Sequence, residues 1–312
     1  MRALLPLLLI AEAAHLQAAS FSQIVVFGDS LTDTGNSYLA VGLPPSPPYF
    51  NGRFSNGPLW IEHLAAGLGL PVAPALAGGT NYAVAGARTG ADGTVPGTGV
   101  TSIVDFYRAL NPVLDPNALF VLTGGGNDLL DASVKTLSEA EMEAKGAANN
   151  LLQNAANLAT QGAKHILMAS SGNVGATPGS ILNGDPATAT YITGLFNSDL
   201  KAGVDFLQAT VPAGQFYFVD QNAILNAIIQ DAVINAGAKY GITDVLSPCS
   251  LTAVPCSQAL WFDLDHPTAK VHELYGAAAL AAMVPEPSSM ALMGVAAAFG
   301  LLAGRRVIVR SR

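Results

Sequence analysis

Four short apolar runs constrain the fold of this chain more than any other feature of its sequence. They occupy residues 24–27, 118–122, 166–169 and 216–219. Each lacks the polar alternation of a half-exposed strand, which indicates a strand buried on both faces, as in a parallel sheet. Because helical patterns lie between the runs, we predict a single α/β domain with a mostly parallel sheet over residues 21–284.

The segments between these runs carry the periodicity of helices. A capping-box pattern, Ser138 followed by Glu141, predicts the start of a long helix with an apolar stripe through residues 151–159. Further helices are expected at residues 59–68, 103–110, 191–209, 224–236 and 267–283. The Gly- and Pro-rich stretches 41–48 and 90–99 are predicted surface loops of the same domain.

Both ends of the chain differ from this domain. Residues 1–20 combine a basic residue, an apolar run and a small-residue end, which is the layout of a secretory signal peptide. Residues 285–312 begin with Pro-Glu-Pro, and their apolar segment 290–304 is followed by arginines that suit a cytoplasmic stop. This segment is short beside the roughly 20 residues of a spanning helix. We therefore predict a short transmembrane segment that anchors the chain transiently.

The predicted domain is strongly acidic, so we do not expect it to bind nucleic acid. Positions 21–284 hold nine Lys and Arg residues against 20 Asp and Glu residues, a net charge of −11. Phosphate binding needs clustered basic side chains, and this sequence contains no basic run there.

Cys249 and Cys256 are the two cysteines of the chain. In an exported protein we expect them to form a disulfide that closes a small loop. Metal binding is the alternative, but no His or second Cys pair stands at ligand spacing beside them.

Ser30 is the first candidate catalytic residue, because it follows the first apolar run in the sequence Gly-Asp-Ser. In open α/β sheets, ligands bind at the carboxyl ends of the strands. A turn or a helix cap is the alternative role for this serine. The surroundings are not the Gly-x-Ser-x-Gly elbow of α/β-hydrolases, because Thr32 stands two residues later. A serine nucleophile also requires a base, a group that orients the base, and donors for an oxyanion.

His266 is the candidate base. It precedes Pro267, which favours a helix start and keeps the preceding residue extended, so the imidazole is expected to face a cleft. Asp263 can hold one imidazole nitrogen and leave the other to face Ser30. Asp265 is a competing orienting group. The other histidines are expected to be structural or to lie in the signal segment; they are His15, His63, His165 and His272.

Two segments offer donors for an oxyanion. Gly86 stands in Asn-Tyr-Ala-Val-Ala-Gly-Ala, and its missing side chain lets its backbone N–H approach a substrate. Asn127 follows the second apolar run in Gly-Gly-Gly-Asn-Asp and can donate from its amide. Ordinary turns are the alternative for both segments. The glycine run lacks the Gly-Lys-Ser/Thr ending of a phosphate-binding loop.

Together, these blocks resemble the GDSL, or SGNH, hydrolase family of esterases and lipases. That family is marked by Ser, Gly, Asn and His in four ordered blocks, which correspond here to Ser30, Gly86, Asn127 and His266. Residues 51–60 are similar to a stretch frequent in the larger extracellular members, whereas Ala85 stands where many members carry Gly or Ser. The resemblance covers nearly all of residues 22–284.

This resemblance implies a flavodoxin-like three-layer α/β/α sandwich, the SGNH hydrolase fold, and hydrolysis of carboxylic esters without a metal or organic cofactor. It implies an acyl-enzyme on Ser30, a base formed by His266 with Asp263, and an oxyanion hole formed by the Ser30 N–H, Gly86 and Asn127. Some members act on thioesters, phospholipids or acetylated sugars. The implied partner is therefore an ester substrate, either a lipid or an acylated small molecule or glycan.

The tail resembles a PEP-CTERM sorting signal, with Pro-Glu-Pro, an apolar helix and arginines in order. In that family a sortase-like membrane enzyme processes the tail in Gram-negative bacteria. The resemblance implies export to the cell envelope, the cell surface or the extracellular matrix. An ordinary membrane anchor is the alternative.

We therefore expect a secreted serine esterase or lipase. One alternative is a deacetylase that acts on acetylated exopolysaccharide, which the tail favours. Another is a surface glycan-binding protein that has the fold without catalysis.

Overall fold

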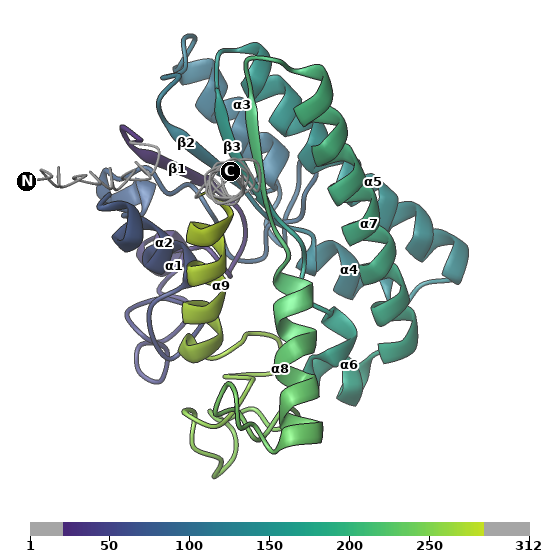
Figure 1. Cartoon of the computed structure of the whole chain (residues 1–312). Coiled ribbons are helices and arrows are strands. Elements are labelled where there is room, and N and C mark those ends of the chain that lie inside the picture. Colours follow the sequence, from purple (N-terminus) through teal and green to yellow (C-terminus); the bar gives the residue numbers. More distant parts are fainter. Residues whose placement is uncertain (1–20, 284–312) are drawn as a thin grey trace, which may run out of the picture. The chain divides into compact units, whose positions relative to one another are not determined.

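The four apolar runs form the strands of one parallel sheet (Figure 1). The strands are β1 (Ile24–Phe27), β2 (Leu119–Leu122), β3 (His165–Ala169) and β4 (Gln215–Val219), and they lie side by side in that order. The computed structural model describes residues 21–283. The predicted signal segment 1–20, residue 284 and the tail 285–312 with its apolar segment 290–304 lie outside that range.

A fifth segment extends the sheet beyond β1. Within residues 80–84, Tyr82 N donates to Val26 O (2.8 Å) and Val84 N donates to Gly28 O (3.0 Å), while Val26 N donates to Thr80 O (3.0 Å). Segment 80–84 therefore lies on one side of β1, and β2 lies on the other side. This is the 2-1-3-4-5 order of flavodoxin-like folds, in which ligands bind where the order reverses, at the carboxyl ends of the strands.

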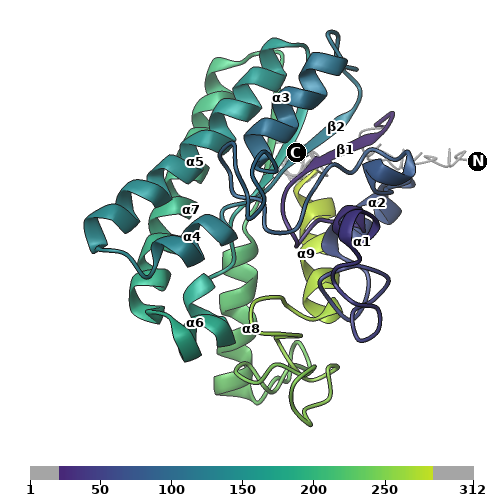
Figure 2. The same cartoon turned by 180° about the vertical axis from the view of Figure 1, so that it is seen from behind.

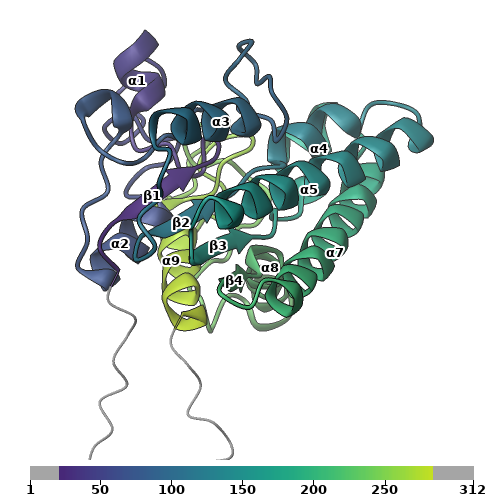
Figure 3. The ribbon, with the colours of Figure 1, turned by 90° about the horizontal axis from the view of Figure 1, so that it is seen from above.

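Helices cover both faces of the sheet, as expected for a three-layer α/β/α sandwich (Figure 3). Successive side chains of a strand point to opposite faces of the sheet. Alternate residues such as Phe27, Phe120 and Met168 therefore pack against the helices on one face. Those helices are α3 (Val100–Leu110), α5 (Leu137–Thr160) and α7 (Pro186–Thr210). The other face carries α2 (Trp60–Leu68) and α9 (Ala269–Ala282), which pack against each other.

Several short helices lie near the strand ends and were not predicted, because they are too brief to show a period. They are α1 (Asn36–Val41), α4 (Gly126–Ala132) and α6 (Pro178–Asn183), with 3-10 turns η1 (Ala75–Ala77) and η2 (Val174–Ala176). Figure 2 shows α6, α8 (Gln221–Asn235) and the loop of residues 236–268 at the same end of the domain.

Five predicted helix starts were wrong. α3 starts at Val100 rather than at residue 103, and α8 starts at Gln221 rather than at residue 224. The capping box of α5 is formed by Thr136 and Glu139 and not by Ser138 and Glu141, so it lies two residues earlier than predicted. Thr136 N and Oγ1 both donate to the Glu139 carboxylate. α7 starts at Pro186 rather than at residue 191, because the Asp185 side chain caps it. α9 starts at Ala269 rather than at Pro267.

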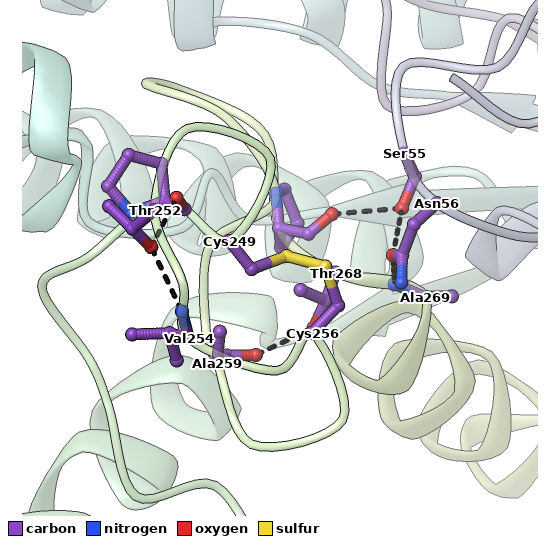
Figure 4. The surroundings of a disulfide bond; sticks show 11 residues. Ser55, Asn56, Cys249, Thr252, Val254, Cys256, Ala259, Thr268 and Ala269 are labelled. Atoms are coloured by element: carbon purple, nitrogen blue, oxygen red, sulfur yellow. Dashed lines mark hydrogen bonds between the residues drawn. A yellow bond between two sulfur atoms is a disulfide. The ribbon is translucent and has the colours of Figure 1, made fainter. Parts of the chain in front are cut away.

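The start of α9 is fixed by segments that are distant in sequence (Figure 4). Ala269 N donates to Asn56 Oδ1 (2.8 Å), and Thr268 Oγ1 donates to Ala259 O (2.9 Å). Pro267 is held before the helix in an antiparallel bridge with Trp261. Sequence signals at Pro267 alone therefore place the helix two residues too early.

The disulfide between Cys249 and Cys256 is formed, and its half-cystine Cα atoms lie 5.1 Å apart (Figure 4). Cys249 packs with Ala259 and Phe262, and its N–H donates to Trp261 O (3.0 Å). The cross-link therefore braces the loop that leads into Asp263.

Within residues 21–283, no helix combines the length and the apolar character that crossing a bilayer requires.

We expect the double substitution Cys249→Ser with Cys256→Ser to lower the free energy of unfolding by about 2.5 kcal/mol, because the cross-link restricts the unfolded chain over a short loop. The melting temperature of the full-length protein should fall by roughly 5–10 °C. Calorimetry of both proteins measures this difference. Wild-type protein in a thiol reductant should match the variant, and equal melting of oxidised wild type and variant would contradict the bond.

Candidate active site

Ser30 lies in the turn directly after β1. Asp29 shapes this turn, because its backbone oxygen accepts from Thr32 N (3.0 Å) and Asp33 N (2.9 Å), and its Oδ1 accepts from Leu31 N (3.0 Å). The N–H of Ser30 donates to none of the described residues. Ser30 therefore offers both a hydroxyl and a free backbone donor at the carboxyl edge of the sheet.

His266 connects this serine to an acid. Its Nε2 lies 2.8 Å from Ser30 Oγ, and its Nδ1 lies 2.8 Å and 2.9 Å from the two carboxylate oxygens of Asp263. A carboxylate only accepts, so Nδ1 carries the proton and Nε2 accepts from the serine hydroxyl. The structure thus brings together the serine, histidine and Asp263 that the sequence singled out.

The carboxylate of Asp263 is held in its charged form. Burial by itself raises the pKa of this group, but the hydrogen bond and charge of His266, with the Asp265 N–H and the Tyr49 hydroxyl, lower the pKa to about 2. The Asp263 side chain also accepts from the backbone N–H of His266 (2.8 Å), which fixes the short turn between them.

The imidazole of His266 has the opposite shift. Burial by itself lowers its pKa, but the hydrogen bond and charge of Asp263, followed by the charges of Asp265 and Asp29, raise the pKa above its ordinary value. The surrounding carboxylates therefore stabilise a protonated imidazole.

Asp265, the competing orienting group, does not contact the imidazole nitrogens. Its Oδ1 faces α6, where a Cβ added to Gly179 would approach it within 2.6 Å. Among the other described histidines, His272 is buried, and its Nδ1 accepts from Trp60 N (3.3 Å). Burial lowers the pKa of His272 to about 3. His165 stacks on Tyr217 beside the sheet.

Two aromatic residues that the sequence reasoning missed buttress the Asp263–His266 pair. The Tyr49 hydroxyl donates to Asp263 Oδ2 (2.7 Å), and the Phe54 ring centroid lies 5.0 Å from that of His266. Tyr49 also packs edge-on against Phe262. The resemblance over residues 51–60 includes Phe54 and begins two residues after Tyr49, but it does not identify either contact.

Asn127 is the second residue of α4 and lines the same cavity as Ser30 and His266. One amide hydrogen donates to Ala87 O (3.0 Å), so the other is available to a ligand. The adjacent Asp128 accepts from Thr89 N (3.0 Å) and Oγ1 (2.8 Å). The Asn-Asp pair therefore ties the start of α4 to the loop after Gly86.

Gly86 occupies the left-handed position of a tight turn, with φ 76° and an Ala87 N to Val84 O bond (3.1 Å). Its N–H donates to none of the described residues. The bond from Val84 N to Gly28 O is the last one between the two segments. Gly86 therefore lies two residues beyond it on one segment, and Ser30 lies two residues beyond it on the other. Gly86 is not part of the cavity lining itself.

The cavity has a volume of about 120 Å³ and follows the carboxyl edge of the sheet from Ser30 towards β4. Its apolar lining includes Leu31, Leu130, Val174, Leu225 and Trp261. His, Cys, Asp and Glu side chains between residues 21 and 283 form no group of three that could hold a metal ion.

A doubly wound sheet with a serine–histidine–aspartate arrangement at its switch point defines the class of serine hydrolases. The family model "GDSL-like Lipase/Acylhydrolase" matches residues 24–279, and the model of the PEP-CTERM protein-sorting motif matches residues 284–307. The chain belongs to the GDSL-like lipase/acylhydrolase family and is a serine hydrolase of carboxylic esters. Its C-terminal motif implies export and surface sorting in a Gram-negative bacterium.

Curated relatives cover most of the chain. A phosphatidylcholine-sterol acyltransferase of Aeromonas hydrophila is 29% identical over 236 residues, which are 74% of this chain and 66% of the relative. A GDSL esterase/lipase of Arabidopsis thaliana is 28% identical over 307 residues, or 82% of this chain and 87% of the relative. Among solved structures, an acetylxylan esterase of Geobacillus stearothermophilus matches with a TM-score of 0.49 and 13% identity, covering 86% of this chain and 97% of that one.

We expect NMR titration of the native protein to give His266 a pKa above the ordinary value of about 6.5. Asp263→Asn should lower this pKa by removing a charged hydrogen-bond partner, and Asp265→Asn should lower it less, because Asp265 acts through charge alone. Equal shifts in the two variants would contradict the assignment of Asp263 as the partner of Nδ1.

Proposed function

We propose that Ser30 is the nucleophile and His266 the general base of the ester hydrolysis. Ser30 Oγ attacks the carbonyl carbon while its proton passes to His266 Nε2. The bond to the alcohol oxygen then breaks as His266 returns that proton to the leaving alcohol, which leaves an acyl-enzyme. A water molecule deprotonated by His266 then attacks the acyl carbon. The bond from that carbon to Ser30 Oγ breaks, His266 returns the proton to Oγ, and the acid is released. The continuous contact from Ser30 Oγ through the imidazole to Asp263 supports this assignment.

We assign the oxyanion hole to the backbone N–H groups of Ser30 and Gly86 and to the Asn127 amide. The tetrahedral intermediate places a negative oxygen beside Ser30, and donors fixed in advance stabilise it without reorganising. This role is supported by the two backbone N–H groups without a partner among the described residues, and by the second amide hydrogen of Asn127, which lines the same cavity as Ser30.

The carboxylates around His266 supply a second electrostatic contribution. Attack converts the neutral imidazole into a cation, and Asp263, Asp265 and Asp29 favour that charge. Catalysis requires the neutral imidazole at the start, so activity falls as the pH falls through the raised pKa of His266.

We infer that residues 1–20 direct export and that segment 290–304 anchors the chain until a sortase-like membrane enzyme processes the tail. The sorting motif supports this route to the envelope, surface or matrix. It also favours a deacetylase acting on acetylated exopolysaccharide as a second candidate function. Acetate release from acetylated polymer, compared with release of longer acids from lipid esters, distinguishes the two.

We expect Ser30→Ala to lower kcat/KM by roughly 10⁴-fold or more across 4-nitrophenyl esters from acetate to palmitate, because no other group replaces the nucleophile. Full-length wild type and variant are assayed in parallel, with circular dichroism to confirm folding. Ser133→Ala removes a buried hydroxyl whose one hydrogen bond within residues 21–283 is to Leu130 O, and it should leave the rates unchanged. Activity retained in Ser30→Ala would contradict the proposal.

Asn127→Ala should lower kcat by about 100-fold or more and leave KM nearly unchanged, because an oxyanion donor acts in the transition state. Steady-state kinetics on the best ester of the series measure both constants. A rise in KM with unchanged kcat would instead assign Asn127 to ground-state binding.

A further inference from the structure

Gln221 is a buried polar residue that the proposed mechanism does not use. It is the first residue of α8, close after β4, and it lines both the catalytic cavity and a smaller cavity behind it. Only 4% of the residue is exposed, and its Nε2 has no hydrogen-bond partner among the described residues. An unpaired buried amide costs free energy that a correctly placed ligand atom recovers.

Tyr275 of α9 presents a second polar group to the same cavity. The residue is 3% exposed, and its hydroxyl makes no hydrogen bond with any residue between 21 and 283. Gly172 leaves space in front of it, because a Cβ at this position would lie 3.5 Å from the hydroxyl and 3.3 Å from Leu225. A larger residue after β3 would fill this part of the cavity.

The charge of the lining restricts the ligand further. Asp29 and Asp265 contribute carboxylates, and the described residues of the lining include no Lys or Arg. An anionic group such as a phosphate would meet repulsion without a cationic partner. Neutral hydroxyl and ether oxygens fit these surroundings, since they accept from the Gln221 amide and the Tyr275 hydroxyl.

We propose that Gln221, assisted by Tyr275, determines specificity by hydrogen-bonding a neutral oxygen in the non-reacting part of the ester. The cavity then selects sugar- or polyol-like substituents over alkyl chains of the same size, because an alkyl chain leaves both groups unpaired. This inference rests on the proposed function, since the cavity is the one that contains Ser30 and His266.

Two pairs of esters of equal size test the proposal on the full-length protein. One pair, 2-hydroxyethyl acetate and propyl acetate, differs in the alcohol half; the other, 4-nitrophenyl methoxyacetate and butyrate, differs in the acyl half. The ratio of kcat/KM within a pair, compared between wild type and Gln221→Leu, cancels intrinsic reactivity. We expect the preference for the oxygenated ester to fall at least about tenfold in one pair, which identifies the half that occupies the cavity.

Gln221→Met repeats the change with an unbranched side chain, and Tyr275→Phe should shift the same ratio in the same direction. Asn222→Leu is the matched control: it also removes an amide with an unpartnered buried atom at the start of α8, but Asn222 does not line the cavity. Its ratios should equal those of wild type. Unchanged ratios in both pairs for Gln221→Leu and Gln221→Met, in folded and active protein, would overturn the inference.

Binding to Ser30→Ala, measured by saturation-transfer NMR with the two acetates, separates this inference from the mechanism. Preferred binding of 2-hydroxyethyl acetate that Gln221→Leu abolishes supports the inference even if turnover does not depend on Ser30. Turnover that depends on Ser30, with no preference in rate or binding, overturns the inference and leaves the proposed function standing. A change in thermal stability alone would show that the amide is purely structural.

Discussion

The buried carboxylate of Asp33 organises the catalytic end of the domain. It accepts from Gly35 N, Asn36 N, Ser37 N, Ser37 Oγ and Ala85 N. Burying a charge is costly unless hydrogen bonds replace its hydration, so the turn after β1, the start of α1 and the segment before Gly86 must converge on this group. Asn36 reinforces the convergence, because its amide donates to Asn81 O and Ala83 O. Much of the sequence block around Ser30 therefore serves to align two backbone segments rather than to react.

The other half of the site is assembled from an irregular loop that needs external support. Asp263 and His266 lie between the disulfide-braced segment and α9, and the loop before α2 contributes Tyr49 and Phe54 from the opposite direction. Ser55 Oγ adds a bond to Pro267 O (3.0 Å) beside the histidine. A base on a loop is positioned only as well as its surroundings allow. In this protein, covalent, aromatic and hydrogen-bond contacts together restrict the imidazole to the direction of Ser30.

The cavity beside Ser30 and His266 has two differently lined parts. Near Ser30 it carries the groups to which we assign the ester hydrolysis. Near β3 and β4 it combines apolar walls with polar groups that have no hydrogen-bond partner among residues 21–283. Polar groups without partners destabilise a folded protein, and such costs persist at sites that recognise a ligand. The carboxylates of the lining raise the pKa of His266. In the mechanism that we propose, the same charges favour the imidazolium that forms during attack and disfavour anionic substituents.

The sequence by itself determined the parallel α/β architecture, the four strands to within one residue, and the cysteine pair. It also singled out Ser30, His266 and Asp263, which the structure places in hydrogen-bond contact. These features depend on local signals: continuous apolar runs, residue types at strand ends, and ordered motif blocks. Tertiary structure alone decided the start of α9, the contacts of Tyr49 with Asp263 and of Phe54 with His266, and the placement of Gln221 in the wall of the cavity. Each of these joins residues far apart in the chain, such as Asn56 with Ala269 and Tyr49 with Asp263. Such pairings have no local period or spacing, because they arise only when the strands align and bring their carboxyl ends to one edge.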